Sequence, residues 1–421
     1  MSSGIYGIRG MSKSVERVAF LSMHTCPLLQ PGTGNAGGMN VYIDELARTM
    51  IDRGVAVDVF TRTTQPSADQ VVEVADGYRV FHIDAGPRAP MPIADMVEYV
   101  EDFAAEVIAT LEVDPPQIVH SHYWLSGSVG LTVKRKLGIP LANSFHTLGR
   151  VKDLTKRSDE SPEPLIRIAT EEEVIRESDC VVAATPFEAQ ELMEHYGADP
   201  TRLCTSPPGI DHGLFAPGDR DAARARLGWP SGPHALFVGR IQPLKGVDVA
   251  LEAAAIVAGS TPGFRFTVIG GASGPSGEVE LAALKRRASE PDLDGVVEFL
   301  DPLPHRDLPD FYRAADVLVL PSRSESFGLV AAEAQSCGLP VVAARVGGLE
   351  HVVDHGRSGL LVHGWDPVDH AEAISSVLDD PSLAESLSDG AVGWSARFSW
   401  EATANRFLEL YSGAVGRAAL G

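Results

Sequence analysis

Residues 316–334 read DVLVLPSRSESFGLVAAEA and contain the clearest sign of the fold of this chain. The apolar run at 316–321 has the length and composition of a buried parallel strand, and the run at 328–334 has those of the first turns of a helix. A strand that leads through a short loop into a helix is the repeating unit of a parallel α/β sheet. Because such sheets bind ligands beyond the carboxyl ends of their strands, we expect the loop between the two runs to belong to a binding site.

This loop and its helix carry side chains that suit a nucleotide-sugar. The free N–H groups of Gly328 and Leu329, at the start of the helix, favour a diphosphate. Glu333 lies in an alanine-rich run that we expect to be buried, and its two carboxylate oxygens can accept hydrogen bonds from vicinal ribose hydroxyls. Glu325, before the turn, would face the sugar, and Phe327 would line the same donor site. The alternative is an amphipathic helix whose glutamates only face water.

Composition and charge limit the classes of protein to which the chain can belong. Its 421 residues favour two domains, and its shares of hydrophobic residues (44%) and charged residues (22%) are those of an ordinary globular protein. A net charge of −22 argues against a nucleic-acid partner, which would require a basic surface. The one compact basic run, residues 134–136, is expected on a solvated helix surface.

Cysteine usage and hydropathy favour the cytoplasm. The four cysteines show no CxxC spacing, which fits a reducing cytosol and gives no zinc framework. No run approaches the roughly 20 apolar residues that span a membrane, so we expect no transmembrane segment. We therefore expect a cytoplasmic protein and leave its oligomeric state open between a monomer and a homodimer.

Strand-loop-helix units head two similar halves of the sequence. In the first half, a strand at 18–23 is followed by a glycine-rich loop and a helix at 40–53; in the second, a strand at 235–240 is followed by a helix at 247–258. Short apolar strands alternate with helices through the rest of each half, which predicts parallel sheets with helices on both faces. The further strands are expected at 55–61, 118–121, 141–145 and 180–184 in the first half, and at 265–269, 296–300, 317–320 and 340–343 in the second.

The alternation predicts an α/β protein of two Rossmann-like domains that face each other across a cleft. We place an N-terminal domain at residues 1–212 and a C-terminal domain at residues 213–399, joined by a Pro- and Gly-rich linker at 207–218. A final helix at 400–421 is expected to pack back on the N-terminal domain. A ligand would lie in the cleft between the domains.

The glycine-rich loop contains a literal GxGxxG from Gly32 to Gly37, so a dinucleotide-dependent oxidoreductase is an alternative. However, the match begins well after the strand ends, and the second strand closes at residues 61–63 without an acidic residue for a ribose. We therefore favour a loop whose backbone closes on a diphosphate or sugar. Gly37 and Gly38 would permit that approach directly before the helix.

Two cations follow the first strand of the second half. Arg240 can hold a diphosphate through two parallel hydrogen bonds, and Lys245 can add a point charge. Together they would stabilise the negative charge that builds on a departing nucleoside diphosphate, so we expect no metal ion. The alternative is a pair of solvated cations beside a turn.

Histidines close two predicted strands of the first half. We favour His146 as a residue that contacts a sugar. His120 and His122 lie two residues apart and could share a face, but no third metal ligand has a suitable spacing, so we assign both mainly to packing. Three cations follow His146 in a predicted loop and could bind a phosphorylated or acidic acceptor: Arg150, Lys152 and Arg167.

Taken together, these motifs resemble those of the retaining GT-B glycosyltransferases of family four, and the resemblance covers nearly the whole chain. It rests on four stretches, residues 32–42, 120–127, 237–245 and 325–333. Within the family, the chain is most similar to the mycothiol-pathway enzymes that move N-acetylglucosamine from UDP-GlcNAc to 1D-myo-inositol 3-phosphate. The resemblance implies a hexosyltransferase that needs no cofactor besides its UDP-sugar donor.

The resemblance also implies a role for each candidate residue. The acceptor would lie against the N-terminal domain and the nucleotide-sugar against the C-terminal domain. The implied catalytic residues are His146, Arg240, Lys245 and Glu325. The implied donor site consists of Gly37, Gly38, Arg240, Lys245, Glu325, Phe327, Gly328, Leu329 and Glu333. The implied acceptor site consists of Asn40, Tyr123, Thr147 and Arg167.

The mechanism implied by the family retains the anomeric configuration without a protein nucleophile. It passes through an oxocarbenium-like state in which the leaving phosphate helps to take the acceptor proton, so the protein supplies mainly positioning and charge stabilisation. One departure concerns the acceptor. The mycothiol enzymes carry a lysine for the acceptor phosphate shortly after a Gly-Pro pair, where this chain has Ile93, and Arg88 could substitute only from another position.

Other substrates therefore remain alternatives. The same fold could use UDP-Glc or another NDP-sugar with a sugar phosphate or a lipid-linked acceptor, although no basic amphipathic helix favours a membrane surface. A protein of another class would be a nucleotide-sugar sensor without activity, or the dinucleotide-dependent oxidoreductase.

Overall fold

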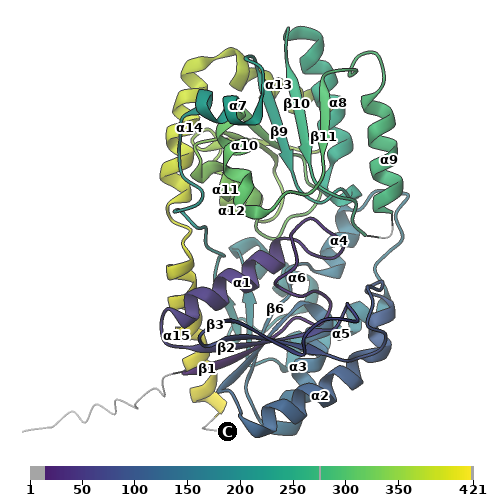
Figure 1. Ribbon diagram of the computed structural model, residues 1–421, viewed down its shortest axis with the longest axis vertical. Helices are drawn as coiled ribbons and strands as arrows, with labels where there is room; N and C mark the ends of the chain where they lie inside the picture. Colours follow the sequence, from purple (N-terminus) through teal and green to yellow (C-terminus); the bar gives the residue numbers. More distant parts are fainter. Residues whose placement is uncertain (1–14, 275, 419–421) are drawn as a thin grey trace, which may run out of the picture.

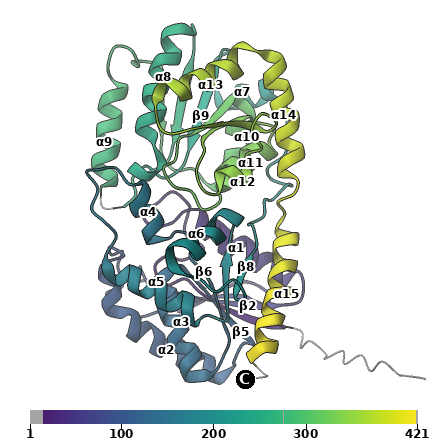
Figure 2. The same cartoon turned by 180° about the vertical axis from the view of Figure 1, so that it is seen from behind.

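The computed structural model describes residues 15–274 and 276–418. Within these residues the chain forms two α/β halves, one above the other in Figure 1, each built on its own sheet. The view from behind in Figure 2 shows helices on both sides of each sheet. These two layered halves are the architecture that the alternation of strands and helices predicts.

The first sheet has the strand order β3-β4-β2-β1-β5-β6-β7-β8. Its neighbouring strands run parallel except at one edge, where β3 pairs antiparallel with β4. The order reverses between β1 and β5, and ligands of such sheets bind at this switch point. The strands are β1 (Arg17–Leu21), β2 (Ala56–Arg62), β3 (Val71–Ala75), β4 (Tyr78–Ile83), β5 (Ile118–His122), β6 (Leu141–Ser144), β7 (Cys180–Ala183) and β8 (Leu203–Thr205).

Two apolar clusters cover the faces of the first sheet. On one face α1 packs with the last helix of the chain, and on the other face α2, α3, α5 and α6 supply the buried side chains. The helices of this half are α1 (Gly38–Ile51), the 3-10 helix η1 (Asp95–Tyr99), α2 (Val100–Val113), α3 (Tyr123–Leu137), α4 (Gly149–Thr155), α5 (Leu165–Glu177) and α6 (Pro186–Tyr196).

The second sheet is parallel throughout and has the order β11-β10-β9-β12-β13-β14, with its switch point between β9 and β12. A single apolar cluster joins both of its faces to the helices. The strands are β9 (His234–Val238), β10 (Arg265–Ile269), β11 (Val297–Leu300), β12 (Val317–Leu320), β13 (Val341–Ala344) and β14 (Gly359–Val362). The helices are α7 (Arg220–Leu227), η2 (Pro243–Lys245), α8 (Val247–Ser260), α9 (Gly277–Ala288), η3 (His305–Asp307), α10 (Leu308–Ala314), α11 (Leu329–Ser336), α12 (Leu349–Val352), α13 (Pro367–Asp379) and α14 (Pro381–Ser395).

The chain crosses between the halves twice. The second crossing leads from α14 to α15 (Trp400–Ala418), which lies beside α1 in the lower half of Figure 1. The two crossing segments meet where Ile210 pairs with Ser399 in an isolated parallel bridge. The predicted boundaries at residues 212 and 399 stay a prediction, and residues 1–14 of the first predicted domain lie outside the described part of the chain.

The structure differs from the sequence prediction in several elements: strands β3, β4 and β8 of the first half and β14 of the second were not predicted, and the segment after β6 contains two helices. The edge hairpin of β3 and β4 was not predicted, because Glu73 interrupts the apolar run of β3, and Arg79 and His82 interrupt that of β4. Arg150 and Lys152 lie on helix α4 and Arg167 lies on helix α5, so the prediction of one long loop for all three is wrong. Only the segment between these two helices, with its prolines, is irregular.

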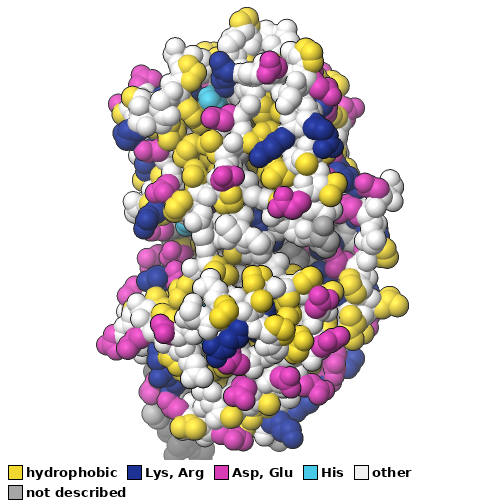
Figure 3. Space-filling model, turned by 45° about the vertical axis from the view of Figure 1, so that its right-hand side comes forward, with side chains coloured by type: hydrophobic (Ala, Val, Ile, Leu, Met, Phe, Trp, Pro, Cys, Tyr) yellow, Lys and Arg dark blue, Asp and Glu magenta, His cyan; other side chains and the backbone are white. Residues whose placement is uncertain are grey.

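The surface carries both signs of charge. On the face shown in Figure 3, Lys and Arg side chains are scattered among Asp and Glu side chains and form no continuous basic area. None of the helices in residues 15–274 and 276–418 is both long enough and apolar enough to cross a membrane.

Candidate active site

A cleft lies between the carboxyl ends of the two sheets and is lined by both halves. It contains the loops that follow β1, β9 and β12, which are strands of the two switch points. All nine predicted donor-site residues line it, as do His146 and Thr147, whereas Asn40, Tyr123 and Arg167 do not. The structure thus brings together the residues that the sequence placed in one donor site.

Two helix N-termini, those of α1 and α11, meet at the cleft. A Cβ atom on Gly38 would lie 3.4 Å from the side chain of Leu329, and one on Gly37 would lie 3.1 Å from Nε of Arg240. Asn40 holds this loop in place, because its Oδ1 accepts the Gly37 N–H at 2.9 Å. The next N–H groups, in the first turn of α1, have no acceptor within the helix and are available to an anion.

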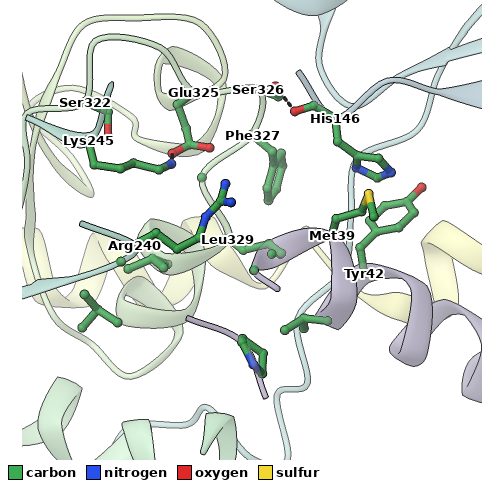
Figure 4. Close-up of a pocket in the computed structure, with 18 of the residues that line it drawn as sticks. Met39, Tyr42, His146, Arg240, Lys245, Ser322, Glu325, Ser326, Phe327 and Leu329 are labelled. Atoms are coloured by element: carbon green, nitrogen blue, oxygen red, sulfur yellow. Dashed lines mark hydrogen bonds and ion pairs between the residues drawn. The ribbon is translucent and has the colours of Figure 1, made fainter. Parts of the chain in front are cut away.

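On the opposite side of the cleft, α11 begins at Gly328, which has a φ of +102°. This left-handed conformation favours glycine, and a Cβ at this position would also lie 2.8 Å from the side chain of Leu349. The turn points the start of α11 into the cleft, with Phe327 immediately before it (Figure 4).

Arg240 extends into the cleft from the loop after β9. Its guanidinium forms no ion pair with a carboxylate in the described part of the chain, and its only hydrogen bond there is a long one, 3.5 Å, to Ser273 Oγ. Burial lowers the pKa of Arg240, although a guanidinium remains protonated in proteins. A partly buried cation without a counter-ion is an arrangement that suits an anionic ligand.

Lys245 and Glu325, both of the second half, form an ion pair that lines the cleft. The Lys245 ammonium donates to Glu325 Oε2 at 2.5 Å, and Figure 4 shows this pair beside Ser322. Both side chains keep about a fifth of their surface exposed, with 19% for Lys245 and 22% for Glu325. The pair therefore remains open to a ligand that brings both hydroxyl groups and negative charge.

Glu333 lies on α11, lines the cleft and is buried, as the sequence predicts. Its Oε1 is 2.7 Å from Nε2 of His305, and its Oε2 accepts a hydrogen bond from the Tyr312 hydroxyl at 3.1 Å. Burial by itself would lower the pKa of His305, but the Glu333 carboxylate outweighs it and raises the pKa above its usual value. Each carboxylate oxygen retains a further lone pair that can accept from a ligand.

His146 enters the cleft from the segment after β6, with a positive φ of 62° that few non-glycine residues adopt. The Ser326 hydroxyl donates to the His146 carbonyl at 2.6 Å, so the loop of the second half fixes this backbone of the first half. Nε2 of His146 lies 3.0 Å from Nδ1 of His122. Burial lowers the pKa of His146 to about 3, and its imidazole is therefore neutral.

Three of the four predicted acceptor residues form one cluster. Arg167 donates from Nη2 to the carbonyl and to Oγ1 of Thr147, at 3.0 and 3.1 Å, and its guanidinium lies 5.1 Å from the ring centre of Tyr123. Glu163 and Glu171 form ion pairs with Arg167 at 2.8 and 2.7 Å. Asn40 lies apart from this cluster.

The other predicted cations near the acceptor site are engaged by carboxylates. Lys152 pairs with Glu163, Arg150 with Glu172, and Arg88 with Asp84. Ile93, at the place of the lysine expected from the resemblance, packs its side chain against the apolar core of the first half. No cation therefore replaces that lysine from position 93.

Sequence reasoning missed three residues of the site. His305 and Ser326 act on Glu333 and on the His146 backbone, and His24 lies against the ring of Tyr123 at 4.5 Å. His24 follows the central strand β1, so a polar residue at a strand end was a usable signal. The contacts of His305 and Ser326 depend on tertiary packing and carry no such signal.

In residues 15–274 and 276–418, no three side chains of His, Cys, Asp or Glu are grouped closely enough to hold an ion. The expectation that the reaction needs no metal stays a prediction.

Comparison with known protein families gives two matches that together cover most of the chain. Residues 219–394 match the family described as "Glycosyl transferases group 1", and residues 37–209 match the family described as "Glycosyl transferase 4-like domain". The chain is also 47% identical, over 415 residues and 96% of both chains, to the D-inositol 3-phosphate glycosyltransferase 2 of Catenulispora acidiphila.

Two solved structures show the same fold. A sucrose-phosphate synthase from Thermosynechococcus elongatus superimposes with a TM-score of 0.89 at 30% identity, covering 96% of this chain and all of that one. Anabaena Alr3699/HepE, solved in complex with UDP-glucose, gives a TM-score of 0.75 at 19% identity, covering 94% of this chain and 99% of that one. The predicted GT-B fold is thereby confirmed.

Proposed function

The chain belongs to the group 1 glycosyltransferases, and on that basis we propose that it moves a hexose from a UDP-sugar to a polar acceptor with retention of configuration. The family match makes the chain a glycosyltransferase and overturns the alternative of a dinucleotide-dependent oxidoreductase. The leading donor is UDP-GlcNAc and the leading acceptor is 1D-myo-inositol 3-phosphate.

The observation that carries the donor assignment is the Arg240 guanidinium, which lies in the cleft without a carboxylate partner in the described part of the chain. In a protein with a net charge of −22, such a cation favours an anionic ligand. The N-termini of α1 and α11 direct N–H groups to the same place. A diphosphate held by Arg240, Lys245 and Gly38 would satisfy all of these groups.

The ribose and the hexose of the donor, which flank the diphosphate, would contact other residues of the cleft. Glu333 would accept from the ribose hydroxyls through the lone pairs that His305 and Tyr312 leave free. Glu325 and His146 would contact the hexose, and Phe327, which Figure 4 shows near both, would line the donor site beside it. Anabaena Alr3699/HepE, with the same fold, was solved with a UDP-sugar, which supports this class of donor.

The proposed chemistry needs no protein nucleophile. Glu325 is paired with Lys245, and the neutral His146 can donate or accept a hydrogen bond but carries no charge. Arg240 and Lys245 would stabilise the negative charge that develops on the departing UDP, while its phosphate oxygen helps to take the acceptor proton. The sugar would then be attacked on the face from which UDP leaves.

The acceptor assignment rests on the relative from Catenulispora acidiphila and on the cluster of Arg167, Thr147 and Tyr123 beside the cleft. Arg167 would position Thr147 for the acceptor, because Glu163, Glu171 and Thr147 already accept from its guanidinium. Asn40 would act through the loop at Gly37. The similarity to a sucrose-phosphate synthase and the side chain of Ile93 favour a second candidate, transfer from UDP-Glc to another sugar phosphate. The cytoplasmic location and the choice between monomer and homodimer stay predictions.

The test is a coupled assay of UDP release with UDP-GlcNAc and with UDP-Glc, each with and without myo-inositol 3-phosphate. We expect acceptor-dependent release from UDP-GlcNAc, and a loss of about tenfold to a hundredfold in UDP affinity for Arg240→Gln, the value of one or two charge-assisted hydrogen bonds. The exposed Arg406→Gln serves as the matched control. UDP release at the same rate with and without the acceptor would rule out inositol phosphate as the acceptor. Binding of a UDP-sugar without any turnover would indicate a nucleotide-sugar sensor.

A further inference from the structure

Two histidines from neighbouring strands meet below the cleft. His122 ends β5 and is fully buried, and His146 follows β6, which pairs with β5 in parallel. Their rings stack at 5.2 Å between centres and 29° between planes, and Nδ1 of His122 lies 3.0 Å from Nε2 of His146. At this distance one of the two nitrogens donates a proton and the other accepts it.

Neither ring is charged. Burial is the largest cause that lowers the pKa of each, to about 3 for His146, and neighbouring His120 and His24 lower that of His122 further. A neutral imidazole carries one N–H, so the contact allows only two arrangements. Either His122 donates from Nδ1 to His146, or His146 donates from Nε2 to His122.

The other nitrogen of His122 distinguishes the two arrangements. Nε2 of His122 is buried and has no hydrogen-bond partner in the described part of the chain. If His146 donated, this nitrogen would carry a buried N–H without a hydrogen-bond acceptor, in an imidazole against which the rings of Phe20 and Tyr42 pack at 5.2 and 5.8 Å between centres. An unsatisfied buried N–H is rarer than an unsatisfied acceptor, and an aromatic ring is a weak acceptor. The donor in this pair is therefore His122.

We propose that His122 is a positioning residue that fixes the Nδ1–H tautomer of His146, so that His146 donates a hydrogen bond into the cleft. If His122 donates, Nε2 of His146 accepts, and the single proton of His146 resides on Nδ1. His146 lines the cleft, and its Nδ1 has no bond to a side chain or backbone group of the described residues. The HxH pair at positions 120 and 122 therefore contributes more than packing.

The same geometry explains why His146 keeps its strained backbone. The hydroxyl of Ser326 holds its carbonyl from one half of the protein, and His122 holds its ring from the other. Because the ring and the backbone of His146 are both fixed, its Nδ1–H is held in one orientation, toward the cleft. Under the proposed function, this N–H would donate to a hydroxyl oxygen of the donor hexose. That contact rests on the proposed function, whereas the tautomer of His146 does not.

The first test measures the tautomer without substrate. The protein with ¹⁵N-labelled histidine rings is examined by long-range proton-nitrogen NMR, in which a protonated ring nitrogen is separated from a bare one, and His146→Gln assigns the signal among the 13 histidines. We expect His146 to carry its proton on Nδ1, and His122→Leu to convert it wholly or partly to the Nε2–H form. A wild-type His146 protonated on Nε2 would overturn the proposal, even if His122→Leu failed to fold.

The second test separates positioning from packing. His122→Asn keeps an amide N–H near the place of Nδ1–H, whereas His122→Leu removes it. We expect His122→Leu to lower kcat/KM for the UDP-sugar about tenfold, the value of one hydrogen bond, while UDP itself binds within twofold of wild type. His122→Asn should recover most of the loss, and His370→Leu, a buried histidine of α13, should show none of it.

Equal losses of UDP and UDP-sugar binding in His122→Leu would mean a general loss of packing and would contradict the positioning role. Failure of the proposed function has a different signature: the wild-type protein would turn over no UDP-sugar, while the NMR experiment would still report the tautomer of His146.

Discussion

At the scale of the residue, Glu333 is a buried carboxylate whose hydrogen-bond partners stabilise it at the wall of the cleft. It is 4% exposed, yet both of its oxygens have a hydrogen-bond partner, and the imidazole of His305 adds a positive charge when it is protonated. A charge that is buried with such partners avoids most of the desolvation cost that an isolated one would meet. The sequence indicated Glu333 by its place after a strand, but it could not indicate His305, which is 28 positions away and meets it only in the folded sheet.

This pair makes the stability of the protein depend on pH in a definite direction. Because the folded-state pKa of His305 lies above the unfolded value, the pair contributes fully below a pH of about 6.5 and its contribution is lost as pH rises through the raised pKa. We expect His305→Gln to lower the free energy of unfolding by about 1.5–3 kcal/mol at pH 6, the value of a hydrogen bond to a charged group, and by less at pH 9.

Urea denaturation at the two pH values measures this difference. The exposed His363→Gln provides the control and should change the free energy of unfolding by the same small amount at both. A deficit in His305→Gln that stayed constant from pH 6 to pH 9 would mean that the imidazole is neutral throughout and that the ion pair does not form.

At the scale of elements, the central strands were predictable because they are short apolar runs. Predicted strands at 118–121 and 317–320 differ from β5 and β12 by one residue at most. The edge hairpin escaped prediction although Asp76-Gly77, a typical hairpin turn, separates its strands. The apolar runs of these strands are interrupted by polar residues, Glu73 in β3 and Arg79 and His82 in β4, so neither strand matches the continuous apolar run of a central strand.

Helix α15 follows the second half in the sequence but packs on the sheet of the first half. Its fully buried Phe407 packs against Tyr42 of α1 and His120 of β5, with ring centres 6.4 and 5.1 Å apart. We expect Phe407→Ala to lower the free energy of unfolding by about 3–5 kcal/mol, the cost of removing a buried aromatic ring.

Chemical denaturation followed by circular dichroism measures the loss, and the exposed Glu409→Ala on the same helix should stay within about 0.5 kcal/mol of wild type. If both variants behaved alike, α15 would contribute little to the N-terminal half, and its apolar contacts with α1 and β5 would not persist in solution.

At the scale of the whole molecule, the contacts between the two halves could not be predicted from the sequence. Two motifs in different halves, at Gly37 and at Arg240, could each be identified, but their distance depends on how two separately folded sheets dock. The contacts that set this arrangement come from residues without any motif. Gln30 donates to the Pro302 carbonyl at 2.8 Å, and Arg157 donates through both terminal nitrogens to Glu280 at 3.0 and 3.1 Å.

The pair of Arg157 and Glu280 joins the segment between α4 and α5 in the first half to α9 in the second half. Because the pair is partly exposed, its contribution to the closed arrangement is about 1 kcal/mol, or about fivefold in the population of that arrangement. We expect Arg157→Ala and Glu280→Ala each to weaken UDP binding by about this factor and to raise the radius of gyration in small-angle X-ray scattering. The double variant should lose no more than either single variant, because the two changes remove one shared interaction. Additive losses would mean that Arg157 acts instead through its other neighbours, such as Asp248 at 3.9 Å, and that this pair alone does not join the two halves.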